Sequence, residues 1–216
     1  MAKLYFSYAS MNAGKSTILL QASHNYRERG MNTLLFTSAL YAEMDNRSIS
    51  SRIGISAPAE LFDNDDDLYE IIARRLEQGE LHCVFVDEAQ FLTKVQVWML
   101  ARVADRLRIP VMCYGLRTDF QGNLFEGSRE LLAIADELRE VRTICACGRK
   151  ATMVVRLDEH GNALTHGDQI SIGKSVYVSL CRAHWEEKTG RWPAEQSESP
   201  RFHFEDDDED PQVAAQ

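Results

Sequence analysis

Ala9-Ser10-Met11-Asn12-Ala13-Gly14-Lys15-Ser16-Thr17 is the most informative segment of this chain for its architecture. It follows an apolar run over residues 4–9 that is typical of a buried strand, and it opens a helix expected over residues 15–29. A Gly-Lys-Ser turn between a strand and a helix predicts a phosphate-binding loop, because backbone amides and the helix N-terminus form an anion cradle. The sequence therefore predicts a nucleotide-binding α/β domain.

Within this loop the residue types suit ATP and its metal ion. Gly14 would let the backbone approach the phosphates, Lys15 would reach the β- and γ-phosphates, and the Ser16 hydroxyl would ligate Mg²⁺. The first glycine of the usual G-x-x-x-x-G-K-[ST] pattern is Ala9 here, which the turn tolerates if its φ is negative. The alternative is a chance Gly-Lys-Ser at a helix start. The predicted ATP-binding residues of the loop are Ala9, Ser10, Met11, Asn12, Ala13, Gly14, Lys15 and Ser16.

A second motif follows the apolar run at residues 83–86, where a strand predicted over 83–87 ends in the pair Asp87-Glu88. Asp87 would hold Mg²⁺ beside Ser16. Because successive side chains of a strand point to opposite faces, Glu88 would point away from Asp87 and could act as general base. Ala89 and Gln90 complete the predicted ATP site. The alternative is a strand that simply ends in solvated acids. The motif also resembles that of helicase-like ATPases, but the chain is too short for a second motor domain.

The architecture predicted from the whole chain is α/β, a P-loop NTPase-type parallel sheet flanked by helices with a small zinc-binding lid. Further strands are expected over 33–37 and 111–115, and further helices over 68–77 and 93–107. After residue 142 the pattern changes to a smaller unit, with strands expected over 152–157 and 169–172. The predicted domains are residues 1–142 for nucleotide binding, 143–192 for the lid, and 193–216 as an acidic, disordered tail.

Cys145, Cys147, Cys181 and His184 form a C-x-C and a C-x-x-H pair around the predicted lid. Three thiolates and one imidazole fill a tetrahedral Zn²⁺ site, which is the pattern of a structural zinc. The alternatives are unrelated free thiols or redox chemistry. Because protein would fill all four positions, we expect zinc to order the lid and to leave ATP affinity within a few-fold.

The charge and hydropathy of the chain argue against long nucleic acids and membranes as partners. The net charge is −9, and the six acids at 205–210 leave about −9 + 6 = −3 for the rest, which argues against binding a long nucleic acid. No apolar run suits a membrane span or a signal peptide, so a cytoplasmic protein without membrane partners is expected.

Taken together, the ordered motifs resemble the type II thymidine kinase family. The resemblance covers about residues 3–190 and also includes Tyr114-Gly115-Leu116-Arg117-Thr118-Asp119-Phe120, with Ile172-Gly173 and Tyr177. It implies transfer of the ATP γ-phosphoryl group to the 5′-hydroxyl of deoxythymidine, with Glu88 as proton acceptor. It also implies a homotetramer and feedback inhibition by dTTP.

The resemblance further implies which residues bind the nucleoside: Phe120, Gln169, Ile170, Ser171, Ile172, Gly173 and Tyr177. The family's D-x-R motif fits 45–47 only if a short insertion precedes it, and Arg52 competes for the same role. Two other classes stay open from the residues alone. A helicase-like ATPase would hydrolyse ATP without a nucleoside, and a nucleotide sensor would bind ATP with negligible turnover.

Overall fold

The computed structural model describes residues 1–40, 47–169 and 176–190. Four of the predicted substrate residues, Ile170, Ser171, Ile172 and Gly173, lie outside these ranges, as do Asp45 and the acidic tail. In the described part of the chain, no helix is long and apolar enough to cross a membrane.

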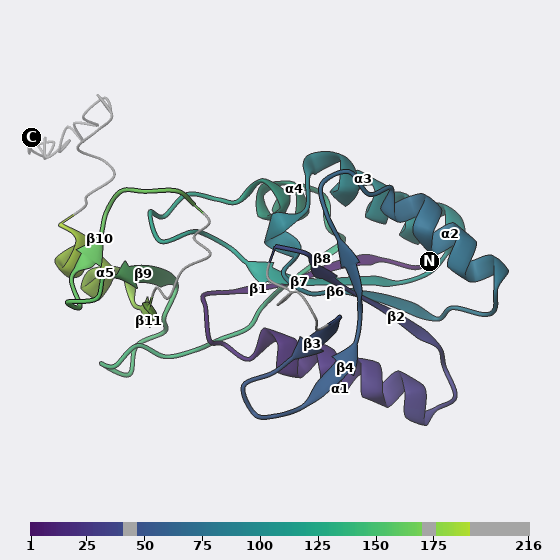
Figure 1. Ribbon diagram of the computed structural model, residues 1–216, viewed down its shortest axis with the longest axis horizontal. Helices are drawn as coiled ribbons and strands as arrows, with labels where there is room; N and C mark the ends of the chain where they lie inside the picture. The colour runs from purple at the N-terminus through teal and green to yellow at the C-terminus, as the bar shows by residue number, and fades with distance from the viewer. Residues whose placement is uncertain (41–46, 170–175, 191–216) are drawn as a thin grey trace, which may run out of the picture.

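A six-stranded sheet, parallel throughout, forms the centre of the molecule, in the order β5-β2-β6-β7-β1-β8 (Figure 1). The parallel sheet predicted from the alternating pattern is confirmed. Each of the four predicted strands ends within one residue of its expected boundary, whereas the short strands β5 and β8 were not predicted. The strands are β1 (Leu4–Ala9), β2 (Thr33–Ser38), β5 (Glu60–Phe62), β6 (Cys83–Val86), β7 (Val111–Leu116) and β8 (Glu137–Glu140).

Helices cover both faces of this sheet (Figure 1). On one face lies α1 (Lys15–Glu28), and on the other lie α2 (Leu68–Glu77), α3 (Lys94–Arg102) and α4 (Glu126–Ile134). The side chains of β6 show why its sequence is apolar throughout. Val84 and Val86 pack into the core under α2, α3 and α4, while Cys83 and Phe85 pack into the core under α1. A strand that is covered on both faces favours an almost continuous apolar run.

The helix predicted over residues 93–107 is divided in the structure. Thr93 is the N-cap of α3 and forms a capping box with Gln96. The α-helix ends at Arg102 and continues as a short π-helix, η2 (Val103–Leu107). Arg108 then takes a left-handed conformation with φ of 58°, so the helical segment stops where the sequence predicted.

A small hairpin lies beside α1 (Figure 1). Its strands, β3 (Ser48–Ser50) and β4 (Ser56–Pro58), place Ile49 and Ala57 in the core under α1. This packing carries the hairpin turn to the carboxyl edge of the sheet, where the phosphate loop also lies.

The second unit is a three-stranded antiparallel sheet with one helix, and it lies at the left of the main sheet in Figure 1. It contains β9 (Met153–Leu157), β10 (Ala163–Leu164), β11 (Val176–Leu180) and α5 (Arg182–Thr189). The strand expected from residue 169 is wrong at its start, because Gln169 lies in a bend. The strand that pairs with β9 is β11, in which the exposed Val176 and Val178 alternate with the half-buried Tyr177 and Ser179.

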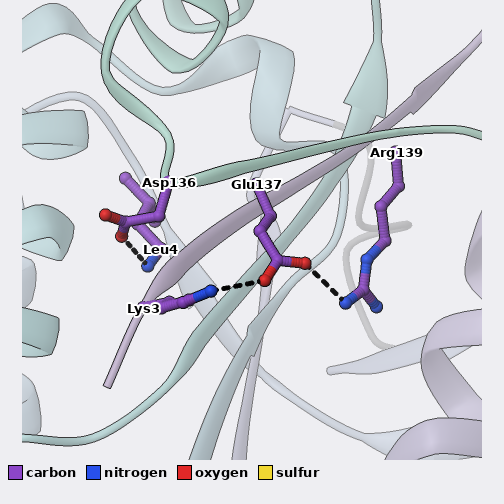
Figure 2. A network of polar contacts seen from close by, with 5 residues as sticks. All are labelled: Lys3, Leu4, Asp136, Glu137 and Arg139. Carbon is purple, nitrogen blue, oxygen red and sulfur yellow. Dashed lines mark hydrogen bonds and ion pairs between the residues drawn. The ribbon is translucent and has the colours of Figure 1, made fainter. Parts of the chain in front are cut away.

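Polar contacts fasten β8 to the edge of the main sheet. The Glu137 carboxylate bridges the Lys3 ammonium at 2.7 Å and the Arg139 guanidinium at 3.0 Å, as Figure 2 shows. The Asp136 carboxylate accepts a hydrogen bond from the Leu4 amide at 2.7 Å. The hydrogen bonds from Lys3 and Arg139 lower the pKa of Glu137, but these groups are exposed and contribute little to stability.

Candidate functional site

The phosphate loop has the backbone that the sequence predicted. Gly14 is the N-cap of α1 with φ of 83°, and Asn12 also has a positive φ of 60°. A Cβ at Gly14 would meet no atom within 4 Å, so the left-handed backbone and not crowding requires glycine there. Ala9 closes β1 and is absent from the residues with positive φ, which removes the objection to alanine at that position.

A cavity of about 370 Å³ opens above this loop at the carboxyl ends of β6 and β7. Of the predicted ATP-binding residues, Met11 to Ser16, Glu88 and Gln90 line it. Ala9, Ser10, Asp87 and Ala89 are buried behind its wall. The other lining residues are Thr17, Ser50, Ser51, Arg52, Ile53 and Leu116. This volume lies within the range of small-molecule and cofactor sites.

Lys15 is buried, and its Nζ donates a hydrogen bond to the Ser10 carbonyl at 3.2 Å. Burial lowers the pKa of its ammonium, and the carboxylates of Glu88 and Asp87 oppose that shift. A buried ammonium is costly without an anionic partner. Its position in the cavity wall is therefore suited to a bound anion such as a phosphate group.

Asp87 is buried beside Lys15. Desolvation and then the neighbouring Glu88 carboxylate raise the pKa of Asp87 to about 7, while a hydrogen bond from Ser16 opposes the shift. Its Oδ1 is buried and has no hydrogen-bond partner among the residues that the structure describes. A buried, unpartnered carboxylate oxygen next to a serine hydroxyl has the chemistry of a Mg²⁺ ligand pair, so Ser16 and Asp87 fit the ion that accompanies ATP.

Glu88 lies differently from the expectation. Strand β6 ends at Val86, and Glu88 takes a left-handed conformation with φ of 53° and ψ of 36°. Its direction is therefore set by this turn and not by strand alternation, so that part of the prediction is wrong. Non-glycine residues in this region are strained, and such strain gathers at functional sites. The carboxylate nevertheless lines the large cavity.

Gln90 holds the Glu88 carboxylate. Its Nε2 donates to Glu88 Oε2 at 2.6 Å, and its Oε1 accepts from the Leu116 amide at 2.8 Å. Because the backbone amide can only donate, it determines which end of the Gln90 amide faces Glu88. Gly115 allows this close packing, since a Cβ there would lie 2.9 Å from both Gln90 N and Gln90 Oε1. Gln90, predicted for ATP, thus also contacts the candidate base.

A second, smaller cavity of about 20 Å³ adjoins the first. Phe120, Gln169 and Tyr177, all predicted to bind nucleoside, lie in its wall. The remaining lining residues are Met11, Phe91, Leu116, Thr118, Asp119, Phe125 and Val154. Met11 and Leu116 line both cavities, so the two spaces share a wall.

Two polar groups shape the small cavity. Asp119 accepts hydrogen bonds from the amides of Gln121 and Asn123 and from Gln169 Nε2 at 2.8 Å. The Arg156 guanidinium lies 4.6 Å from the centre of the Phe120 ring, in a cation–π contact. These contacts fix the aromatic wall and link it to the second unit.

The predicted zinc ligands come together in space. The ligand atoms of Cys145, Cys147, Cys181 and His184 all lie within 4.8 Å of one another. Cys147 Sγ and Cys181 Sγ are 3.8 Å apart, and Cys145 Sγ is 3.2 Å from His184 Nδ1. Tetrahedral zinc with Zn–S bonds of about 2.3 Å separates two sulfurs by about 3.8 Å. Hydrogen bonds from the backbone at Cys147 and Cys181, and then from His184, lower the pKa of Cys145 to about 6. The cluster could therefore hold zinc.

Sequence reasoning left out several residues of these walls. Arg52 was held open as a substrate contact, and it lines the large cavity, whereas Arg47 is not among the lining residues. Behind these walls, Arg156 contacts the Phe120 ring and Ser179 Oγ donates a hydrogen bond to the Met11 carbonyl, and neither residue lay in a motif that could have indicated it. Their positions depend on the docking of the second unit, which no local pattern reports.

The fold and the site together define a P-loop phosphotransferase, because a strand-loop-helix anion cradle and Glu88 line one cavity, the buried Asp87 lies beside the loop, and a second cavity adjoins the first. The match to known proteins is more specific. Residues 2–185 match the family model described as thymidine kinase, and the chain belongs to the thymidine kinase family.

Curated relatives agree with the family model over nearly their full length. The chain is 67% identical to a thymidine kinase of Mesorhizobium japonicum over 88% of this chain and 94% of the relative. It is 63% identical to a thymidine kinase of Ruegeria pomeroyi over 88% of this chain and 96% of the relative. With a thymidine kinase of Vibrio cholerae it shares 57% identity, over 88% and 100%.

Proposed function

We propose that this protein transfers the γ-phosphoryl group of ATP to the 5′-hydroxyl of deoxythymidine and so forms dTMP, a salvage step for DNA synthesis. The observation that carries the proposal is the pair of adjoining cavities that share Met11 and Leu116. One cavity has a phosphate loop, and the other has an aromatic wall against which a nucleobase could stack. A donor and an acceptor bound in adjacent cavities would meet at the shared wall, beside Glu88.

In this proposal Glu88 accepts the proton of the 5′-hydroxyl as the oxygen attacks the γ-phosphorus. Gln90 holds the Glu88 carboxylate in place, and Lys15 stabilises the charge on the phosphates. Ser16 and Asp87 would hold Mg²⁺, which neutralises charge on the β- and γ-phosphates when bound. Phe120, Gln169 and Tyr177 would bind the nucleoside, together with residues 170–173.

The remaining parts of the proposal rest on the family. We keep the division into a nucleotide-binding domain of residues 1–142, a lid of residues 143–192 and a tail. Zn²⁺ at Cys145, Cys147, Cys181 and His184 would stabilise the lid. A homotetramer, inhibition by dTTP and a cytoplasmic location stay predictions. The helicase-like and nucleotide-sensing alternatives are not favoured, since the relatives at 57–67% identity are thymidine kinases.

A coupled assay of ATP consumption across a panel of nucleosides tests the proposed function. ADP should form only when thymidine or a close analogue is present. Turnover that is independent of any nucleoside would instead identify an ATPase, and ATP binding without turnover on any nucleoside would identify a sensor.

The Glu88→Gln variant tests the assigned base in the same assay. It should bind ATP normally and lose about 10²- to 10⁴-fold in kcat, because a nucleoside hydroxyl is a poor nucleophile without a positioned base. Glu77→Gln, which changes an exposed carboxylate on α2, is the matched control. Near-normal turnover of Glu88→Gln would show that another group takes the proton.

A further inference from the structure

Two hydrogen bonds join the second unit directly to the phosphate loop. Ser179 Oγ on β11 donates to the Met11 carbonyl at 2.5 Å. In the opposite direction, Ser10 Oγ donates to the Ala151 carbonyl, just before β9, at 3.2 Å. The nucleotide cradle is therefore in direct contact with the unit that carries the cysteine and histidine cluster.

The same face of β11 also borders the nucleoside cavity. Tyr177 and Ser179 are half-buried, whereas Val176 and Val178 between them are exposed. Residues two apart on a strand point to the same side, so Tyr177 and Ser179 face the main domain together. Tyr177 lines the small cavity, and so does Val154, the residue paired with Ser179 in register.

The Met11 carbonyl matters because of the peptide group to which it belongs. Met11 C=O and Asn12 N–H lie in one rigid peptide plane, so a hydrogen bond that fixes the oxygen also fixes the direction of the amide. Asn12 lines the large cavity and has a positive φ of 60°. Its amide is one of the backbone donors available to form the anion cradle.

We propose that Ser179 is a positioning residue that couples the nucleoside cavity to the phosphate loop. A nucleoside held against Tyr177 orders β11, and Ser179 on that strand orients the Met11–Asn12 peptide for the phosphates of ATP. The inference rests on the proposed function and deepens it.

Coupling of this kind is reciprocal. If bound thymidine tightens the binding of a non-hydrolysable ATP analogue by some factor, the analogue must tighten thymidine by the same factor. A side-chain hydrogen bond to a backbone carbonyl contributes a factor of about 2 to 10 in an equilibrium constant. We therefore expect a coupling factor of that order in the wild-type protein and a value close to 1 without the hydroxyl.

Calorimetric titration of the zinc-loaded full chain with the ATP analogue, with and without saturating thymidine, tests the proposal. Ser179→Ala should weaken analogue binding about 2- to 10-fold when thymidine is present and abolish the coupling. Ser179→Thr keeps a hydroxyl donor and should restore it. Thr165→Ala removes a hydroxyl elsewhere in the second unit and should behave as wild type. Zinc content and thermal unfolding are measured for each variant.

Wild-type coupling in a Ser179→Ala protein that retains its zinc would overturn the proposal. So would loss of coupling in Ser179→Thr to the same extent as in Ser179→Ala, because the strand would then matter and not the hydroxyl. A wild-type chain that binds the analogue but no thymidine would instead contradict the proposed function. In that case the analogue affinity of Ser179→Ala alone still decides whether this hydroxyl orders the loop.

Discussion

Replacing Asp87 with asparagine should make the nucleotide-free protein more stable and abolish its use of Mg²⁺-ATP. The carboxyl is buried, its Oδ1 has no hydrogen-bond partner, and Glu88 lies beside it. Burial and the Glu88 charge raise its pKa from 3.8 to about 7. Asparagine has nearly the same shape and needs no ionisation, so it removes the cost of a buried charge.

The size of this effect depends on pH. Below about pH 4 the carboxyl is protonated in the folded and the unfolded chain, and the substitution should change stability little. Between about pH 4 and 7 the unfolded chain releases the proton while the folded chain keeps it, so wild-type stability falls as pH rises. Above about pH 7 the difference between the two proteins should stay constant. Groups that do not interact with Asp87 are common to both proteins and cancel in this comparison.

The magnitude follows from the pKa shift. At about 1.4 kcal/mol per pKa unit, a shift of about three units sets an upper limit near 4 kcal/mol. The substitution also removes the Asp87 charge from beside the buried Lys15 ammonium, which offsets part of the gain, so we expect about 2 to 4 kcal/mol at pH 8. For a chain of this length that corresponds to a rise in Tm of roughly 4 to 16 °C.

Thermal unfolding without nucleotide or Mg²⁺, from pH 5.5 to 8.5, measures this difference. Asp105→Asn, an exposed carboxylate on η2, is the control and should change stability by less than about 0.5 kcal/mol. Adding Mg²⁺-ATP should raise the Tm of wild type but not of Asp87→Asn. A variant that is less stable than wild type at pH 8, or a difference that does not vary with pH, would refute the reasoning.

Two further predictions concern the candidate base and the metal cluster. Gln90→Glu keeps an acceptor for the Leu116 amide but cannot donate to Glu88, so kcat should fall about 10- to 100-fold with little change in the KM for ATP. Steady-state kinetics checks this, and an unchanged kcat would contradict it. Cys147→Ser and Cys181→Ser should each lower zinc content and raise the KM for thymidine. Full zinc occupancy in both variants, or an unchanged KM after metal loss, would count against a lid ordered by zinc.

The sequence by itself determined the framework of this protein. The largely apolar runs at β1, β2, β6 and β7 predict buried parallel strands, because strands covered on both faces are rich in apolar residues. Gly14 and Lys15 between a strand and a helix likewise indicate the phosphate loop, because its geometry depends on a few adjacent backbone angles. The close spacing of Cys145 with Cys147, and of Cys181 with His184, was enough to suggest a metal site.

Only the tertiary structure decided how the groups at the site face one another. Strand alternation was the wrong basis for the direction of Glu88, because a left-handed turn and a hydrogen bond from Gln90 set it. Ser179 contacts Met11 across 168 positions of sequence, and the Arg156 guanidinium lies over the Phe120 ring through the docking of a separate sheet. Such contacts arise from the packing of distant segments. Local patterns report backbone conformation and burial, whereas the partner of a polar side chain is determined by what the rest of the chain brings beside it.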